Sequence, residues 1–473
     1  MRLQRWELAI GLIGLLIGGG LLLFWLSPRL LAFGPVGTAV SAAQPIELRL
    51  NRGLELTAAE QFLQITPSVN GQFLISEGRL QFAPLSGWPY GQQLTVTIRA
   101  GWPGQNGLPL WRGRQWTFEV GEPDIYFVTT DQTGSLIWTT SPGEDEPEIW
   151  LREVGEIVEA VMAPDGRTLL LTLLDDQNRT HLVRHRRFPP AREVLLTCSD
   201  TVCRQPWPQP DGQLVAYERL PAAGRGQQPE VWLLDSLSGQ SWPAHDPTLF
   251  GEPSVAAALA APFSHSPRWS PDGRTLAYFK PDASLIILLD VTGGSPPALI
   301  PAQLNEMGGW SPQGDSLIYT ELTFGDPSFF EQWEEAILAG DDAQHLEPGL
   351  YNHLVRTELV GGRTTDLSAG LPVEEGSPGW SPDGRYLAFT RSLGGGGRQI
   401  WYSQADGSNA TPLTDDPFYH HSAPRWSPDG RYLLFMRSSL VPGSEAPAIW
   451  LVEIATGQFT QISAYGFLPG WRP

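Results

Sequence analysis

The chain has 473 residues, of which 51 are Gly and 43 are Pro. Both residue types interrupt helices, so the composition excludes a helical bundle or a coiled coil and favours an all-β protein. The 51 acidic and 31 basic residues give a net charge of −20, which argues against nucleic acid as a partner because an acidic surface repels phosphates.

The N-terminus contains a predicted membrane anchor. From Leu8 to Pro28 the chain carries no charge, and as a helix this stretch would span ~31 Å, the thickness of a bilayer's hydrocarbon core. Arg2 and Arg5 precede it, so the positive-inside rule places the N-terminus in the cytoplasm and the bulk of the chain outside. The alternative is a signal peptide cleaved near residues 39–43, although the apolar stretch is longer than such peptides usually have.

The predicted division of the N-terminal region is a cytoplasmic tip and single-pass transmembrane anchor over residues 1–33, a linker over 34–44 and a β-sandwich over 45–121. Within the sandwich, short alternating runs predict strands near 46–51, 61–67, 80–84, 93–101 and 114–120, separated by Gly/Pro turns. With the Gly-rich segment "GQNGLPL" before the last strand, the pattern resembles a bacterial Ig-like domain of the surface-layer type. Such a domain would serve as a stalk.

Residues 122–473 contain a repeated motif. The strongest copies are "SPRWSPDGRTLAYF" (Ser266–Phe279), "SPGWSPDGRYLAFTR" (Ser377–Arg391) and "APRWSPDGRYLLFMR" (Ala423–Arg437). Ser-Pro-Asp-Gly is turn chemistry, the Trp before it can fill the gap between packed sheets, and the apolar run after it predicts a buried strand. Counting weaker copies, the turn glycines are Gly166, Gly212, Gly273, Gly314, Gly384 and Gly430.

Short antiparallel strands repeated in this way predict the blades of a β-propeller. The chain ends in "PGWRP", the start of another motif copy, whose missing second and third strands are predicted at "DIYFVTT" (Asp124–Thr130) and "SLIWTTS" (Ser135–Ser141). One blade would then combine both ends of the array and close the ring. Seven blades are favoured, and six remain possible if a degenerate copy is not a blade.

The motif resembles the repeat of TolB-type propellers, also called the PD40 or WD40-like β-propeller repeat. The resemblance covers about three quarters of the chain. Gln313 departs from it by replacing the turn Asp, and the two earliest copies lack the Trp at its usual place. The resemblance implies a module that binds other envelope proteins, with the channel mouth taking a peptide segment.

The two cysteines, Cys198 and Cys203, flank a short polar loop, and in an oxidising compartment this spacing predicts a local disulfide. No further ligands for a metal site are evident beside them.

Candidate binding residues lie just upstream of the Trp positions, where the loops entering the innermost strands converge at the rim of the channel. A mixed ring of basic, acidic and imidazole groups there could hold a peptide or an anionic group. The alternative is that they are ordinary polar residues near strand starts. The candidates are His265, Arg268, Glu375, His420, His421 and Arg425.

Three further segments stand out. The insertion between Glu321 and Leu350 contains "FFEQWEEAILAG", which predicts an amphipathic acidic helix that either packs on the propeller or docks a partner. The Ala-rich segment from Trp242 to Pro262 predicts a helical or irregular cover. The basic stretch from Arg179 to Arg192 predicts either a blade strand protected from edge pairing or a patch for anionic lipids or an acidic partner.

The sequence contains no Gly-x-Ser-x-Gly elbow, no His-Glu-x-x-His and no nucleotide-binding loop, so it predicts no catalytic residues, cofactor or metal. The expected function is a membrane-anchored, extracytoplasmic binding or scaffolding module of the bacterial cell envelope, with a protein or peptide partner. The rival classes are a propeller-type hydrolase or lyase acting on envelope peptides or glycans, and a sensor that relays ligand binding through its anchor.

Overall fold

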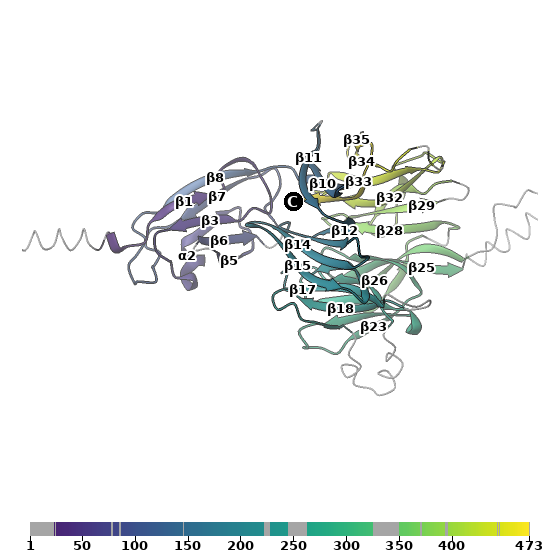
Figure 1. Cartoon of the computed structure of the whole chain (residues 1–473), viewed down its shortest axis with the longest axis horizontal. Helices are drawn as coiled ribbons and strands as arrows, with labels where there is room; N and C mark the ends of the chain where they lie inside the picture. Colours follow the sequence, from purple (N-terminus) through teal and green to yellow (C-terminus); the bar gives the residue numbers. More distant parts are fainter. Residues whose placement is uncertain are drawn as a thin grey trace, which may run out of the picture. The chain divides into compact units, whose positions relative to one another are not determined.

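In the computed structural model, the chain divides into two compact units, with the boundary in the sequence between Glu122 and Pro123 (Figure 1). The structure describes residues 23, 25–76, 79–84, 87–144, 146–221, 228–244, 263–324, 350–368, 371–392, 396–441, 443 and 445–472. Most of the predicted anchor, residues 8–28, lies outside these ranges. Among the described residues, no helix has both the length and the apolar character to cross a bilayer.

The first unit is a sandwich of two four-stranded sheets, ordered β1-β3-β6-β5 and β2-β8-β7-β4. A 3₁₀ turn (η1, Leu56–Ala58) and a single helical turn (α2, Ala59–Phe62) precede β4. The strands are β1 (Leu30–Gly34), β2 (Gly37–Val40), β3 (Ile46–Leu50), β4 (Leu63–Thr66), β5 (Gly71–Ser76), β6 (Arg79–Pro84), β7 (Gln93–Ile98) and β8 (Arg114–Val120).

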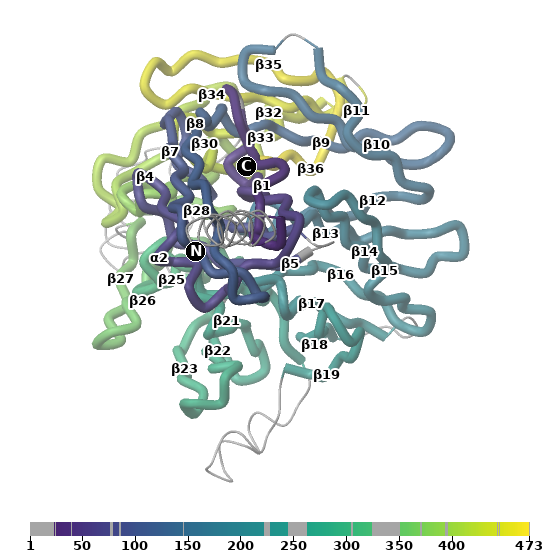
Figure 2. Tube along the Cα trace, turned by 90° about the vertical axis from the view of Figure 1, so that its left-hand side faces the viewer, coloured from purple at the N-terminus to yellow at the C-terminus, as the bar shows by residue number. Residues whose placement is uncertain are grey.

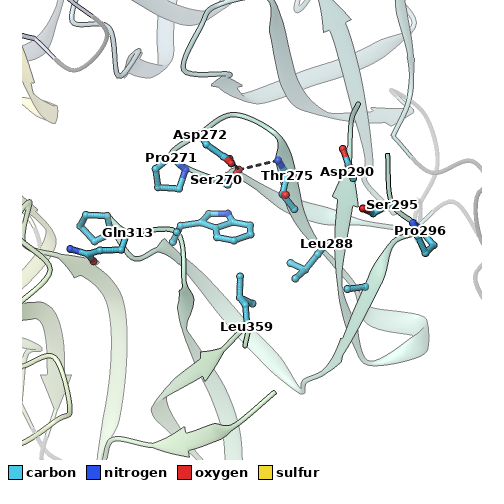
Figure 3. A pocket seen from close by; sticks show the side chains of 14 residues that line it. Ser270, Pro271, Asp272, Thr275, Leu288, Asp290, Ser295, Pro296, Gln313 and Leu359 are labelled. Atoms are coloured by element: carbon cyan, nitrogen blue, oxygen red, sulfur yellow. Dashed lines mark hydrogen bonds between the residues drawn. The ribbon is translucent and has the colours of Figure 1, made fainter. Parts of the chain in front are cut away.

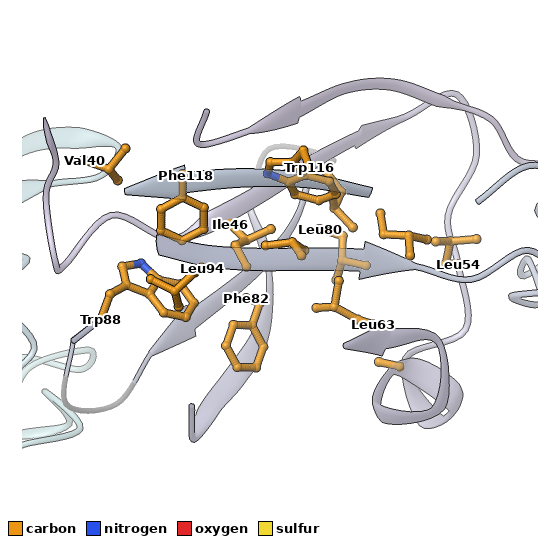
Figure 4. Packing of buried hydrophobic residues seen from close by; sticks show 14 of the residues in the cluster. Val40, Ile46, Leu54, Leu63, Leu80, Phe82, Trp88, Leu94, Trp116 and Phe118 are labelled. Atoms are coloured by element: carbon orange, nitrogen blue, oxygen red, sulfur yellow. The ribbon is translucent and has the colours of Figure 1, made fainter. Parts of the chain in front are cut away.

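Alternation along the strands builds the core between these two sheets. In β8 the side chains of Trp116, Phe118 and Val120 are buried while their neighbours face outward, as the two-residue period of a strand requires. They pack against Trp88 and Leu94, among others (Figure 4). Antiparallel pairing holds each sheet together, except that β2 runs parallel to β8.

The predicted linker over residues 34–44 is wrong, because this segment belongs to the sandwich. β1 pairs with β3, and β2 pairs with β8. The backbone between these strands is also held in place: the indole Nε1 of Trp88 donates to the carbonyl of Gln44 at 2.7 Å, and Ala42 is buried. The sandwich therefore begins at Leu30.

The second unit contains seven four-stranded antiparallel sheets among its described residues. They follow one another around an axis, from blue through teal and green to yellow in Figure 2. The innermost strand of each sheet contacts the next sheet, and the last sheet contacts the first, so the sheets form a closed β-propeller. A 3₁₀ turn (η3, Pro281–Ala283) joins β21 to β22.

Listed from the innermost strand outward, the first four sheets are β36 (Phe467–Arg472), β9 (Asp124–Asp131), β10 (Gly134–Thr140) and β11 (Glu148–Glu153); β12 (Glu156–Met162), β13 (Thr168–Leu174), β14 (Thr180–Arg187) and β15 (Pro190–Cys198); β16 (Thr201–Pro208), β17 (Leu214–Pro221), β18 (Glu230–Asp235) and β19 (Ser241–Pro243); and β20 (His265–Trp269), β21 (Thr275–Lys280), β22 (Leu285–Asp290) and β23 (Ala298–Pro301). The other three are β24 (Leu304–Trp310), β25 (Ser316–Phe324), β26 (Leu350–Glu358) and β27 (Thr364–Asp366); β28 (Glu374–Trp380), β29 (Tyr386–Ser392), β30 (Gln399–Gln404) and β31 (Thr411–Pro412); and β32 (Tyr419–Trp426), β33 (Tyr432–Ser439), β34 (Ala448–Glu453) and β35 (Phe459–Ser463).

Both ends of the array share one sheet, as the split motif predicts. β36, the last strand of the chain, pairs with β9, and Trp471 lies opposite Ile125. Arg472 forms an ion pair with Asp124 across the same junction. The predicted turn glycines all have positive φ, between 62° at Gly166 and 74° at Gly430, which favours glycine over residues with a Cβ.

The two predicted insertions fall largely outside the described residues. β25 ends at Phe324 and β26 begins at Leu350, so the predicted acidic helix lies in the segment that is not described. Of the segment from Trp242 to Pro262, only residues 242–244 are described.

A disulfide joins Cys198, at the end of β15, to Cys203 in β16 and so links two neighbouring sheets. We therefore expect the purified protein to react with no thiol reagent after denaturation without reductant, and at two sites after denaturation with it. Mass-spectrometric counting of labelled cysteines measures this directly. Two labelled thiols in unreduced protein isolated from the cell envelope would contradict the prediction.

Candidate functional site

Five of the seven innermost strands share a bulge just before the position of the motif Trp. At this point a residue other than glycine adopts positive φ, and the register of the strand shifts against its neighbour. The bulge residues are Gln205, Ser266, Ser377, Ala423 and Leu468, with φ between 49° and 57°.

Carboxylates from the preceding sheet satisfy the backbone of several bulges. Glu159 accepts the N–H of Gln205 at 2.5 Å, and Glu218 accepts that of Ser266 at 2.9 Å. Glu306 does the same for Ser377 at 2.7 Å. These acids therefore link neighbouring sheets and hold the strained backbone in place.

The motif Trp also joins neighbouring sheets. The indole Nε1 of Trp269 donates to the carbonyl of Trp207 at 2.9 Å, and that of Trp310 to the carbonyl of Arg268 at 3.0 Å. Trp471 repeats the bond with the carbonyl of Arg425 at 3.1 Å. These three bonds fix the backbone of Trp207, Arg268 and Arg425 on their inner strands.

Arg268 lies at such a position and is held by backbone oxygens. Its guanidinium donates to the carbonyls of Pro267 at 2.8 Å and Met307 at 3.0 Å, and it lies 4.0 Å from the centre of the Trp207 ring. Burial lowers the pKa of Arg268 to about 10, and the charge of Arg425 adds to this effect.

Arg425 occupies the same register position three sheets further along. Its side chain is exposed, and within the described part of the chain no acidic side chain pairs with it. Burial raises the pKa of Tyr126 in the adjoining sheet, and the charge of Arg425 opposes that shift. The ring thus brings the charges of Arg268 and Arg425 within reach of each other although 157 positions separate them in sequence.

Glycines occupy three other positions of this register. In their own sheets, Arg268 pairs with Ala277 and Arg425 pairs with Leu434. The residues equivalent to Ala277 and Leu434 in three other sheets pair with glycines, which are Gly309, Gly379 and Gly470. The glycines have no side chains at these points, whereas Arg268 and Arg425 place positive charge there, and the carboxylates of Glu306 and Glu218 act on Arg268. Both arginines were predicted from the sequence as candidate binding residues.

The structure places the acidic candidate elsewhere. Glu375 is fully buried and accepts hydrogen bonds from Arg391 Nε at 2.7 Å, Leu354 N at 3.0 Å and the Ser368 hydroxyl. Its carboxylate is thus used within the fold, and it joins the sheet of β28 to that of β26.

Of the three histidine candidates, His265 lies within electrostatic reach of Arg268: burial lowers the pKa of His265, and the charge of Arg268 adds to that effect. His421 is buried beside Phe435, with Nδ1 3.3 Å from the carbonyl of Arg398. His265 is half-buried against Phe279, and His420 is half-buried in β32.

We expect His421 to destabilise the protein in acid. Burial lowers the pKa of His421 to about 4, whereas an imidazole in the unfolded chain titrates near ~6.5. Between these values the unfolded state binds more protons, so stability falls as the pH falls from neutral. His421→Gln should remove about 2 kcal/mol of the loss in free energy of unfolding between pH 8 and pH 5. Urea titrations of both proteins at the two pH values test this, and identical pH dependences would contradict it.

The basic stretch from Arg179 to Arg192 is largely neutralised by carboxylates of its own sheet and of the preceding one. Arg184 pairs with Glu193 at 2.6 Å, and Asp175 accepts from Arg179 at 2.8 Å. Glu153, buried at the end of β11, binds both His185 at 2.5 Å and Arg192 at 2.9 Å. The stretch forms β14 and the start of β15, and this pairing favours its structural interpretation.

A cavity of about 570 Å³ lies between the sheets that begin with β20 and β24 (Figure 3). The turn after β20 contributes Asp272, β22 contributes Leu288 and Asp290, and the end of β24 contributes Trp310. The sequence motif contains two of these residues, but the cavity itself depends on how neighbouring sheets pack and was not predicted.

Comparison with known proteins finds partial similarity in sequence and in structure. No family model matches it. It is 27% identical over 203 residues to the uncharacterized peptidase YuxL of Bacillus subtilis, a match covering 39% of this chain and 28% of that protein, so the chain spans well under two thirds of this relative. Similar solved structures include TolB from Acinetobacter baumannii, with 11% identity, a TM-score of 0.44 and coverage of 88% of this chain and 84% of the other. They also include the β-propeller domain of the Trilobed protease from Pyrococcus furiosus, with 9% identity, a TM-score of 0.47 and coverage of 80% and 96%.

Proposed function

We propose that this protein is a binding module of the bacterial cell envelope, in which a TolB-like propeller of seven blades is presented outside the membrane by an Ig-like stalk and an N-terminal anchor. The propeller binds a peptide segment of another envelope protein at its inner strands. The supporting observation is the exposed guanidinium of Arg425, which lies within electrostatic reach of Arg268 and has no acidic partner among the described residues.

Two guanidinium groups favour an anionic feature of the peptide, such as an Asp or Glu side chain or a C-terminal carboxylate. Arg268 already donates to three backbone carbonyls, at Pro267, Met307 and Gly308. Its guanidinium therefore contributes positive charge near the ligand and does not bind the ligand directly. Arg425 is then the group that contacts the ligand directly.

The test is capture from envelope extract with the whole, detergent-solubilised chain carrying a tag. Arg425→Ala should lose a specific partner that the wild-type protein retains. Arg385→Ala is the matched control, because this arginine also lies on the propeller and its side chain is 75% exposed. Arg268→Ala is less suitable, since it also removes bonds between neighbouring sheets. Equal capture by wild type and Arg425→Ala would contradict the proposed site.

The rival function is a hydrolase or lyase that acts on envelope peptides or glycans. It is favoured by the partial match to YuxL, whose name describes it as a peptidase. Incubation of the purified chain with panels of peptides and glycans distinguishes the two functions, because turnover supports the enzyme and stable, unmodified capture supports the binding module.

Protease treatment of intact spheroplasts tests the proposed location, because a propeller outside the membrane should be digested by protease added from outside.

A further inference from the structure

The cavity in Figure 3 combines apolar walls with acidic groups. The apolar part of its wall consists of Trp310, Leu288 and Leu359, and its carboxylates are those of Asp272 and Asp290. None of the residues that line it is cationic. Its volume of about 570 Å³ lies in the range of small-ligand sites.

Both carboxylates are held in the ionised form. Asp272 accepts from the Ser270 hydroxyl at 2.6 Å, and Asp290 accepts from the backbone and hydroxyl of Thr292 at 2.9 and 2.5 Å. These hydrogen bonds hold the pKa of each carboxyl below its usual range. The nearby cation that acts on both, Arg274, is exposed and does not line the cavity. A ligand in this space therefore meets negative charge.

In the gap between the next two sheets, which begin with β24 and β28, a side chain of the protein itself occupies the corresponding site. Leu288 lies opposite Ala277, and Arg356 lies opposite Ile318. Ala277 and Ile318 hold the same register position relative to the motif Trp of their own sheets. Leu288 and Arg356 are therefore equivalent residues of consecutive sheets.

Arg356 covers the Trp of the sheet that follows it. Its guanidinium lies 5.5 Å from the centre of the Trp380 ring, and its Nη1 donates to the carbonyl of Ala405 at 3.4 Å. The Ser311 hydroxyl holds the pKa of Asp315 below its usual range, and the charge of Arg356 contributes to that effect. In this gap the protein itself thus places a guanidinium over a Trp and near a turn carboxylate, where the preceding gap has a shorter Leu288 and a cavity.

We propose that the cavity over Trp310 binds an arginine side chain presented by a peptide segment of a partner protein. The guanidinium lies over the indole of Trp310, near Asp272 and Asp290, and its methylene stem lies along Leu288 and Leu359. A planar guanidinium suits stacking on the indole as well as hydrogen bonding to carboxylates. This site goes beyond the function proposed above, because it does not involve Arg425 or the partner bound there.

The binding test uses acetyl-Gly-Arg-Gly-amide as the probe and the same peptide with citrulline as its neutral counterpart, titrated against the whole chain by NMR. We expect the arginine peptide to bind with a dissociation constant of about 1 mM and the citrulline peptide to bind at least about tenfold more weakly. Asp272→Asn and Asp290→Asn should each weaken binding by about fivefold or more. Asp429→Asn is the matched control, since Asp429 makes the same turn contacts with Ser427 in another sheet.

A second variant fills the proposed site with a side chain of the protein itself. Leu288→Arg copies Arg356, so its guanidinium should cover Trp310, leave the melting temperature within about 2 °C of wild type and abolish binding of the probe. The proposal is overturned by equal binding of the two peptides, by equal losses in Asp272→Asn and Asp429→Asn, or by a fall in melting temperature of more than about 5 °C in Leu288→Arg. Arg425→Ala should bind the probe normally, which separates this site from the one proposed above.

Discussion

Deletion of residues 466–473 is expected to unfold the propeller. The deletion removes β36, the innermost strand of the sheet that begins and ends the ring, and exposes the edge of β9. It also removes Trp471, which is 7% exposed and packs against Ile125 and Leu434. Calorimetry and circular dichroism of the whole chain should show loss of the propeller's cooperative transition, because no single sheet buries both of its faces alone.

Point variants test whether the contacts of β36, and not merely the shortening of the chain, stabilise the propeller. Trp471→Ala should lower the free energy of unfolding by about 3–5 kcal/mol, since it leaves a cavity and removes the bond to the carbonyl of Arg425. Trp242→Ala, at a position 40% exposed in the edge strand β19, should cost less than about 1 kcal/mol. An unchanged melting transition after the deletion would refute closure by β36.

Glu375→Ala is expected to produce the second large loss of stability. The substitution leaves the guanidinium of Arg391, which is also buried, without its carboxylate partner at 2.5 Å. The backbone N–H of Leu354 loses one of its acceptors as well. Removing one member of a buried pair costs about 3–5 kcal/mol, which urea unfolding at neutral pH will measure.

The control for this variant is an exposed ion pair. Glu193 binds Arg184 at 2.6 Å, but its side chain is 45% exposed, so Glu193→Ala should cost about 1 kcal/mol or less. Glu375→Gln should cost less than Glu375→Ala because the amide oxygen still accepts hydrogen bonds. Equal losses in the two alanine variants would show that burial adds nothing to the Glu375 pair.

The propeller could be predicted because its turns depend on local chemistry, and even the imperfect copies keep that chemistry. Gln313 replaces the turn Asp, yet Asp315 accepts the hydrogen bond from the Ser311 hydroxyl at 2.7 Å. Gln209 stands where other copies have Ser and bonds the backbone of Leu214 at 3.1 Å. The degenerate copies therefore form the same turn with different side chains.

The bulges explain why the candidate site was only partly predicted. Successive side chains of a strand point to opposite faces, and an extra residue reverses the order beyond it. Glu375 and His421 lie before the bulge of their strands, whereas Arg268 and Arg425 lie after it. A sequence pattern without the register cannot separate these groups.

Partners from distant segments also set limits on the prediction. The pair between Glu375 and Arg391 and the cavity over Trp310 depend on which sheets become neighbours. In the sandwich, β1, β2 and β5 were missed: β1 and β2 fall in the segments assigned to the anchor and the linker, and all three strands lie at the edges of their sheets. Edge strands bury fewer side chains and so show weaker alternation.

The contacts between consecutive turns determine where the propeller tolerates added sequence. Gln209 donates to the carbonyl of Gly273 at 2.7 Å, and Gln313 to that of Asp383 at 3.5 Å, so lengthening one turn would displace the next. A fluorescent reporter or affinity tag for following this protein in living cells therefore does not belong in a Ser-Pro-Asp-Gly turn.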